Sequence, residues 1–322
     1  MDAAELYQYL MTSVLEQPKA DQGPYYSLAD SLDGYAGAVS NASADANQHM
    51  TRLLSSGRGE AMDALGEHWN TVRTQKVQSL ADAGTNTTAA ARDVADILTF
   101  AKDRIIGIAT QCTETLLVAQ LTAPLTLGGS EAALPPAVQA AKVSSARVVE
   151  ECGQRIASRL ALLLEDPAVA GLPDVAAALA GTASGGMAPA VAAGAAVAGA
   201  GGGDARGGPL PSGTGSGAGK GIEVDHAEHV RAAGALREVA TEVYGTPAGT
   251  LTPAASQNGA GAASGDLGAA VSATLGTVLD DLAKATGAFG DYLNGTLPDA
   301  VLRISGDQRA TDDGNRKRFG TL

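Results

Sequence analysis

Residues 24–72 read PYYSLADSLDGYAGAVSNASADANQHMTRLLSSGRGEAMDALGEHWNTV, and this stretch decides the predicted fold. Apolar residues recur every three or four positions before the glycines at 57 and 59, and again after them. This spacing places the apolar side chains on one face of an α-helix. The two rows are Leu28, Leu32, Tyr35, Val39, Ala42, Ala46, Met50 and Leu53, then Met62, Leu65, Trp69 and Val72. Two helices that each carry an apolar face and are joined by a short glycine-containing turn are expected to fold back on each other as a helical hairpin.

The second arm of this hairpin continues to about residue 123. Its apolar row contains Val94, Leu98, Ala101, Ile105, Ile108, Cys112, Leu116 and Ala119. We expect a weak point at residues 84–88, where a glycine adjoins several poor helix formers. A short helix over residues 3–15 precedes the hairpin. Beyond the prolines and glycines of residues 124–136, a further helix is predicted from Val138 to Leu164, ended by Asp166 and Pro167.

The second half of the chain begins with a change in composition. Alanine and then glycine and serine dominate residues 167–221, which predicts a flexible linker. A helix should follow, with Asp225 as its N-cap, and residues 245–265 are expected to form a polar connection. The next helix carries a regular apolar seam that predicts packing against another helix. This second-module seam consists of Val271, Leu275, Val278, Leu282, Ala285, Phe289 and Tyr292.

The composition of the 322 residues agrees with an all-α fold. Of the residues, 45% are hydrophobic but only 3% are aromatic, and alternating strand-like runs are essentially absent. We therefore predict a long antiparallel helical hairpin or bundle over residues 1–166. The Ala/Gly/Ser-rich linker follows over 167–221, and a smaller helical hairpin occupies 222–322.

The formal net charge of −13 argues against nucleic-acid binding, because an acidic chain repels phosphate. The N-terminus lacks the basic and apolar segments of a cleaved signal peptide. The most apolar stretch, residues 105–123, is interrupted by Gln111, Glu114 and Gln120, so no membrane-spanning helix is expected.

No set of residues predicts a catalytic, cofactor or metal site. The sequence Gly219-Lys220-Gly221 resembles the end of a phosphate-binding loop, but it lacks the first glycine, the final hydroxyl and a preceding strand. His226 and His229 could lie on adjacent turns, yet an exposed polar helix start is the better interpretation because further converging ligands are missing. We therefore expect a protein that is not an enzyme.

Cys112 and Cys152 both lie on apolar rows. Two buried free thiols are the preferred interpretation, since unpaired cysteine is among the most buried residue types. If their helices pack antiparallel and the protein reaches an oxidising compartment, a disulfide between them is the alternative. Trp69, the only tryptophan, is expected to fill a helix seam.

The turn and the helix after it resemble the WXG-type helical hairpins of type VII (ESX) secretion. The residues that carry the resemblance are Gly57, Gly59, Ala61, Leu65 and Trp69. Gly59 and Ala61 match the W-x-G-x-A pattern, whereas Gly57 stands in the place of its tryptophan. Over residues 1–165 the chain is similar to the N-terminal module that precedes toxin domains in CpnT-like effectors of actinobacteria.

Residues 222–319 are similar to EspC-like secreted proteins. The similarity lies in the helix opened by Val224 and Asp225, the long seam helix and residues 310–313. That family often carries a tyrosine four residues before an aspartate as part of its export signal, and here Gln308 precedes Asp312. The resemblance implies an export route without a cleaved leader.

These resemblances imply a non-enzymatic protein that acts through helix–helix association. Its expected partners are another helical-hairpin protein, in a hetero- or homodimer, and the type VII secretion apparatus. Two alternatives remain open at this point. One is the delivery or pore-forming half of a toxin without its catalytic domain, and the other is a cytosolic secretion adaptor.

Overall fold

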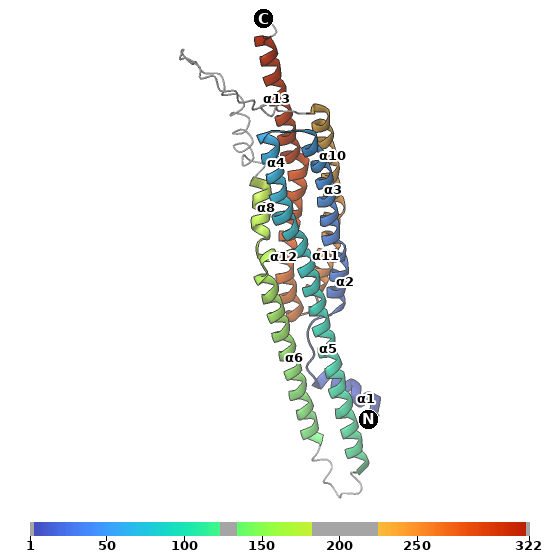
Figure 1. Ribbon diagram of the computed structural model, residues 1–322. Helices are drawn as coiled ribbons and strands as arrows, with labels where there is room; N and C mark the ends of the chain where they lie inside the picture. Colours follow the sequence, from blue (N-terminus) through green and yellow to red (C-terminus); the bar gives the residue numbers. More distant parts are fainter. Residues whose placement is uncertain (1–2, 123–133, 182–224, 320–322) are drawn as a thin grey trace, which may run out of the picture. The chain divides into compact units, whose positions relative to one another are not determined.

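A computed structural model describes residues 3–122, 134–181 and 225–319 (Figure 1). Its elements are α-helices interrupted by three short π-helices, labelled η. They are α1 (Ala3–Tyr9), η1 (Leu10–Val14), α2 (Gly23–Asp33), α3 (Tyr35–Ser56), α4 (Glu60–Thr71), η2 (Val72–Val77), α5 (Gln78–Thr122), α6 (Leu134–Glu165), α7 (Pro167–Ala170), α8 (Leu172–Gly181), α10 (His226–Gly245), α11 (Pro247–Ala262), α12 (Asp266–Asp291), η6 (Tyr292–Thr296) and α13 (Leu297–Phe319).

The predicted all-α class is confirmed, since the described residues contain no β-strand. The helices also follow the predicted apolar rows closely. Of the helices in these ranges, none combines the length and apolarity that a membrane crossing requires.

The chain divides into two compact units, and each unit takes segments from both predicted modules. The first unit, unit 1, comprises residues 1–33, 85–169 and 252–279. Unit 2 comprises residues 34–84, 170–251 and 280–322. This division differs from the predicted sequential boundaries at 166 and 221. Apolar rows attract each other without regard to their order in the chain, so sequence alone does not assign their pairing.

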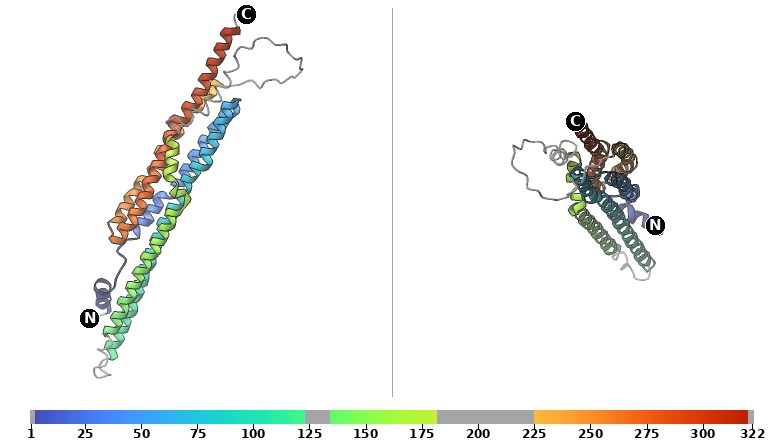
Figure 2. Two further views of the ribbon diagram at one scale, coloured as in Figure 1. Left: turned by 90° about the vertical axis from the view of Figure 1, so that its left-hand side faces the viewer. Right: turned by 45° about the horizontal axis from the view of Figure 1, so that its top comes forward.

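Within unit 1, α5 and α6 run antiparallel and side by side (Figures 1 and 2). Ion pairs link them across the seam: Arg104 to Glu151 at 3.1 Å, and Arg159 to Asp93. Their facing rows are fully buried and are made of Val94, Leu98, Ala101, Ile105, Ala109, Val148, Cys152, Ile156, Leu160 and Leu163. The seam between the two helices follows the predicted rows except that Ala109, rather than the half-buried Ile108, is buried in it.

The N-terminal helices of unit 1 are attached to the same pair. On α2, the Tyr26 hydroxyl donates to Asp96 at 2.5 Å. Arg92 donates to Asp33 at 3.1 Å and lies 3.5 Å from Asp30. These contacts are largely exposed, so they contribute orientation more than stability.

In unit 2, α3 and α4 fold back on each other at the predicted turn. The α3 helix also packs along α10, and α10 packs against η6 and α13 (Figure 1). Arg237 of α10 fixes the second contact by donating to the Asn294 carbonyl and to Asp299, each at 3.2 Å. The apolar row of the first predicted module is thus covered by a helix of the second.

Two segments assigned to a linker and to a connection contain helices. The predicted connection at 245–265 contains α11, and the predicted linker begins with α7 and α8, while its remainder, residues 182–224, lies outside the described residues. Leu251 and Ala254 of α11 are buried, and the Asn258 side chain donates to the Ser272 carbonyl at 2.8 Å. Tertiary burial of this kind outweighs a weak intrinsic helix propensity.

Residues 84–88, where a weak point was expected, show no break. These residues belong to the continuous helix α5, whereas the irregularity is the π-helix η2 at Val72–Val77. Gly84 is not a break. A Cβ atom there would lie only 2.3 Å from the Tyr35 ring, so the glycine permits a close contact between α5 and α3.

Candidate functional site

The WXG-like turn joins α3 and α4 in unit 2. Gly57 is buried in an extended conformation, and Gly59 has a φ of +131°, which favours glycine over residues with a side chain. Leu65 and Trp69 are buried and Ala61 is half-buried on α4. The predicted turn residues therefore lie together in the turn and the interface where α3 and α4 meet.

Trp69 fills the seam between these two helices, as predicted. Its ring is 2% exposed, and its Nε1–H donates to the Asn47 side chain of α3 at 3.1 Å. A buried tryptophan with its one donor satisfied has a packing role. Gly66, one turn earlier, allows the Leu54 side chain of α3 to approach closely.

The second-module seam is buried, as its periodicity predicts. Val271, Leu275 and Val278 belong to unit 1, whereas Leu282, Phe289 and Tyr292 belong to unit 2. All six side chains are at most 2% exposed. This apolar face is therefore covered by the chain itself.

In unit 2, Tyr35 anchors the start of α3 to α12. Its hydroxyl lies 2.6 Å from Thr286 Oγ1, and the Thr286 hydroxyl itself donates to the Leu282 carbonyl at 2.7 Å. The Tyr35 hydroxyl is consequently the donor in the first bond. Burial raises the pKa of Tyr35 above its ordinary value of 10.0, so the phenol stays neutral.

A second tyrosine makes the equivalent connection within unit 1. The Tyr25 hydroxyl of α2 donates to the Gly268 carbonyl at 3.1 Å and lies 3.4 Å from Ser272 Oγ on α12. A Cβ atom on Gly261 would come within 3.0 Å of the Tyr25 ring. Each anchor thus combines a hydroxyl partner on α12 with a glycine that leaves room for the ring. Sequence reasoning placed Tyr35 on an apolar row but assigned no role to its hydroxyl.

The start of α10 is an N-cap as predicted, but its histidines are not both at an exposed polar end. Asp225 accepts from the Ala227 and Glu228 amides at 3.0 and 3.1 Å. His229 and Glu228 are buried, and His229 Nδ1 lies 2.8 Å from the Asp225 carbonyl oxygen. His226 contacts Ser305 of α13 at 2.7 Å. Packing of α10 against α13 buries this turn, which the local sequence does not reveal.

The alternative of a disulfide is wrong, and the preferred interpretation of two buried free thiols is confirmed. Cys112 faces the Ala137 carbonyl, with 3.8 Å between Sγ and oxygen, whereas Cys152 lies beside Ala101. At a rise of about 1.5 Å per residue between Ala137 and Cys152, the thiols are about 22 Å apart. Burial raises the pKa of both, which keeps them protonated and weakly nucleophilic.

The described residues do not bring together a metal site. In the three described ranges, no group of three or more His, Cys, Asp or Glu side chains is arranged to hold a metal ion. His68 lies with its ring centroid 6.1 Å from that of Tyr292, and burial lowers its pKa. The phosphate-loop candidate at residues 219–221 lies outside the described residues.

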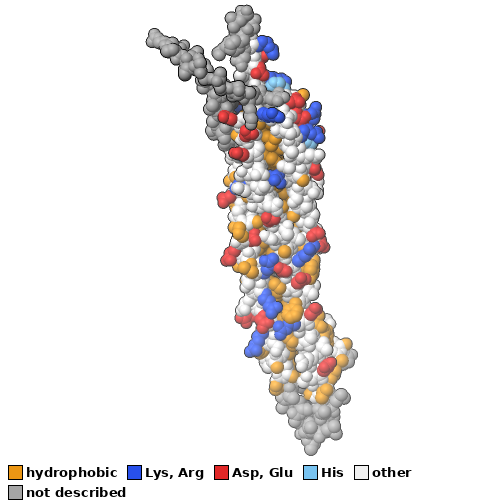
Figure 3. Space-filling model, in the orientation of Figure 1, with side chains coloured by type: hydrophobic (Ala, Val, Ile, Leu, Met, Phe, Trp, Pro, Cys, Tyr) orange, Lys and Arg blue, Asp and Glu red, His pale blue; other side chains and the backbone are white. Residues whose placement is uncertain are grey.

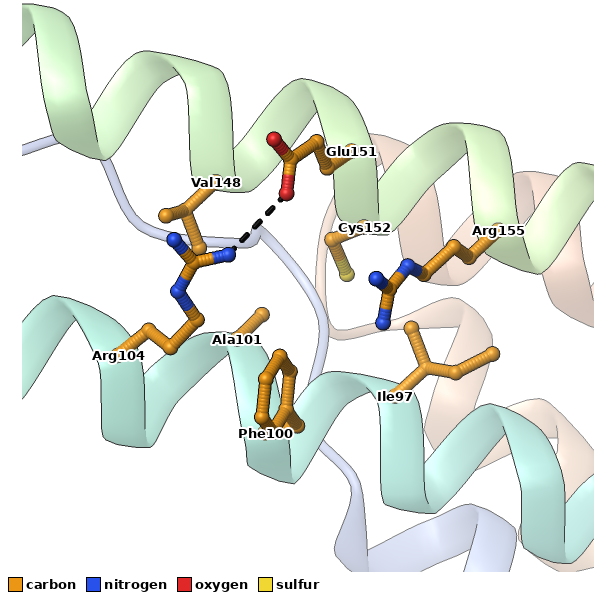
Figure 4. A pocket seen from close by; sticks show the side chains of 8 residues that line it. All are labelled: Ile97, Phe100, Ala101, Arg104, Val148, Glu151, Cys152 and Arg155. Carbon is orange, nitrogen blue, oxygen red and sulfur yellow. Dashed lines mark hydrogen bonds and ion pairs between the residues drawn. The ribbon is translucent and has the colours of Figure 1, made fainter.

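One surface cluster in unit 1 was missed by the sequence reasoning (Figure 4). Phe100 of α5 is 52% exposed, and the guanidinium carbons of Arg104 and Arg155 lie 5.9 and 5.7 Å from its ring centroid. A separate open groove of about 580 Å³ between α5 and α6 shares Ile97 and Arg155 with this cluster but is not lined by Phe100. The Phe100–Arg104 spacing of four residues could have revealed part of this cluster, but Arg155 comes from another helix.

Comparison with protein-family models, curated proteins and solved structures finds no match to this chain. The functional interpretation therefore depends on the residues and their geometry. Among the described residues, that geometry is dominated by buried helix–helix contacts.

Proposed function

We propose that this chain is a non-enzymatic helical component of an actinobacterial type VII secretion system, exported as a substrate or acting as a partner-binding protein. Its mode of action is helix–helix association. The WXG-like turn and the EspC-like second half motivate the assignment. The observation that carries it is the packing of α3, from the first predicted module, along α10 of the second.

This packing suggests how the partner is supplied. A single hairpin with an apolar row needs another hairpin to cover it. Here Tyr35 of the first module bonds to Thr286 of the second within unit 2. We propose that the chain provides this partner hairpin in cis and associates with the secretion apparatus as a self-paired protein.

The export part of the proposal concerns α13. Gln308 stands where the related signal carries tyrosine, and its amide donates to Asp312 at 3.1 Å. The four-residue spacing of the signal is thus retained on a helix, while the aromatic ring is missing. We propose that this helix is the region that the apparatus recognises.

Export is tested by measuring the protein in culture filtrate from an actinobacterial host with and without the secretion ATPase. A cytosolic protein followed in parallel controls for lysis. We expect ATPase-dependent export, and Gln308→Tyr should increase it relative to Gln308→Ala. Retention in the cytosol under both conditions would contradict export and favour the adaptor alternative, whereas leakage from liposomes would favour the toxin-delivery alternative.

Self-pairing is tested separately by co-expression with helical-hairpin proteins from the same secretion locus. Light scattering after size exclusion should give a folded protein without a stably bound hairpin partner. A stoichiometric complex that forms only when Tyr35→Ala opens the pairing face would support the cis arrangement. A complex with the unaltered chain, formed through α3, would contradict it.

A further inference from the structure

His68 of α4 and Tyr292 of η6 form a contact within unit 2 that leaves a polar atom of each side chain without a partner. The two ring centroids lie 6.1 Å apart, and the ring planes are inclined by 47°. His68 Nε2 and the Tyr292 hydroxyl are both buried, and among the described residues neither makes a hydrogen bond. Buried polar atoms of native proteins are nearly always bonded, so two unbonded ones in a single contact are unusual.

The surroundings of this contact favour an uncharged imidazole. Tyr292 is fully buried, and so are Leu65 and Trp69, which flank His68 on α4. Burial lowers the pKa of His68 and raises that of Tyr292. Both shifts favour the neutral form, because a buried charge loses its hydration.

The neighbouring elements do not supply a counter-charge to His68. Within two turns of Asn47, the α3 residue that bonds to Trp69, the titratable or charged side chains are Asp45, His49 and Arg52. Glu67 and Arg73 lie near it in sequence on α4 and η2, and η6 contributes the neutral Tyr292. All of these except Tyr292 are exposed or half-buried. Burial is the cause of the lowered pKa of His68, and these charges do not contribute to it.

We propose that this contact makes the attachment of α4 to η6 acid-sensitive. Proton uptake by the imidazole of His68 gives an imidazolium whose buried Nε2 is an N–H donor without an acceptor. The charge regains its hydration when the contact opens, which separates α4 from η6 and exposes Trp69 to water. Stability is therefore complete above pH 6.5, the ordinary value for histidine, and is lost as the pH falls from there through the lowered pKa. The contact lies within unit 2, and the proposal is independent of export.

The test is urea unfolding of the full chain, followed by the emission of Trp69, the only tryptophan. Measurements at about pH 7.5 and about pH 5.5 bracket the ordinary pKa of histidine and stay above that of carboxylates. The second condition matters because Asp and Glu side chains are spread over the visible surface (Figure 3). Between the two pH values, the equilibrium constant of unfolding should rise by at most about tenfold per pH unit for the one proton of His68. His68→Phe should remove this contribution, since phenylalanine keeps a ring in the contact but takes up no proton.

His49→Phe is the matched control, because His49 is also a half-buried histidine of unit 2 but lies outside the contact with Tyr292. The proposal is overturned if His68→Phe and His49→Phe respond equally to acid, or if the unaltered chain is equally stable at both pH values. His68→Gln, which is also neutral, provides a second variant should phenylalanine disturb the fold, and circular dichroism verifies folding. Independently, the proton NMR signal of the His68 Cε1–H group should titrate below pH 6.5, and titration above that value would also overturn the proposal.

Discussion

Tyr35 of unit 2 and Phe100 of unit 1 are both aromatic residues on long helices, yet their surroundings are opposite. Tyr35 is fully buried, its hydroxyl is bonded to Thr286, and Gly84 leaves room for its ring. Phe100 is half-exposed, and the guanidinium carbons of Arg104 and Arg155 lie within 6 Å of its ring centroid. The first arrangement is part of the buried core of unit 2, whereas the second is a surface contact in which about half of the phenylalanine stays exposed.

The comparison is tested most strongly by truncating the two rings. Removal of a fully buried aromatic side chain costs about 3–5 kcal/mol, so Tyr35→Ala should lower the free energy of unfolding by that amount. Phe100→Ala is the matched control and should change it by less than about 1 kcal/mol, since much of the ring is already in water. Urea unfolding followed by circular dichroism measures both, and equal losses would contradict the assigned roles.

The space beside Tyr35 can be tested with two glycines of the same helix, α5. Gly84→Ala places a Cβ atom 2.3 Å from the Tyr35 ring and should destabilise unit 2 by about 1–3 kcal/mol. At Gly107 a Cβ atom meets nothing within 4 Å, so Gly107→Ala should stabilise the protein by about 0.5–1 kcal/mol. Thermal melting of both variants should therefore show shifts of opposite sign. A stabilising Gly84→Ala would disprove the close contact.

Unfolding at alkaline pH should distinguish the unaltered chain, with its buried Tyr35 phenol, from the Tyr35→Phe variant. Burial raises the pKa of Tyr35 above 10.0, so above that pH the unfolded chain releases a proton that the folded chain retains. Stability then falls with rising pH by about 1.4 kcal/mol per pH unit for this residue. Tyr35→Phe should lose about 1 kcal/mol near neutral pH, because one hydrogen bond disappears, but decline less steeply above pH 10. The measurement is the free energy of unfolding in urea as a function of pH. Equal slopes above pH 10 for the unaltered chain and for Tyr35→Phe would contradict this assignment.

The smallest expected effect concerns the arginine over Phe100. An exposed cation–π contact contributes about 0.5–1 kcal/mol, so Arg155→Gln should lower stability by no more than that. Arg104→Gln provides a reference, because it removes both the contact with Phe100 and the ion pair with Glu151. If Arg155→Gln proves as damaging as Gly84→Ala in the same urea unfolding assay, the contact of Arg155 with Phe100 is not the minor surface contact described here.

Much of the local structure could be predicted because its causes are local. The three-and-four spacing from Leu28 to Leu53 marks one face of a helix whatever that face packs against. Gly59 signals the turn because its positive φ is costly for other residues. The buried faces of α5, α6 and α12 were identified in the same way.

The sites themselves were predicted only in part. Trp69 lies in a helix seam, as predicted. The apolar face of α12, which was expected to contact a partner hairpin, is buried by the chain itself. The disulfide alternative and the exposed position of His229 were wrong. The separation of Cys112 and Cys152 along the helix axes follows from the register in which α5 packs against α6. Burial of His229 follows from the packing of α10. Neither is encoded in the residues immediately around them.

The sequence by itself determined where the helices lie, which faces are apolar and where the first hairpin turns. Only the tertiary structure decided that α3 pairs with α10, that Gly84 receives the Tyr35 ring, and that Arg155 of α6 meets Phe100 of α5. The physical reason is that hydrophobic attraction has no direction, so similar apolar rows are interchangeable as partners. One helix pairing is distinguished from another by specific contacts, namely glycines that leave room for an aromatic ring and the hydroxyl of Thr286. These groups come together only when the chain is folded.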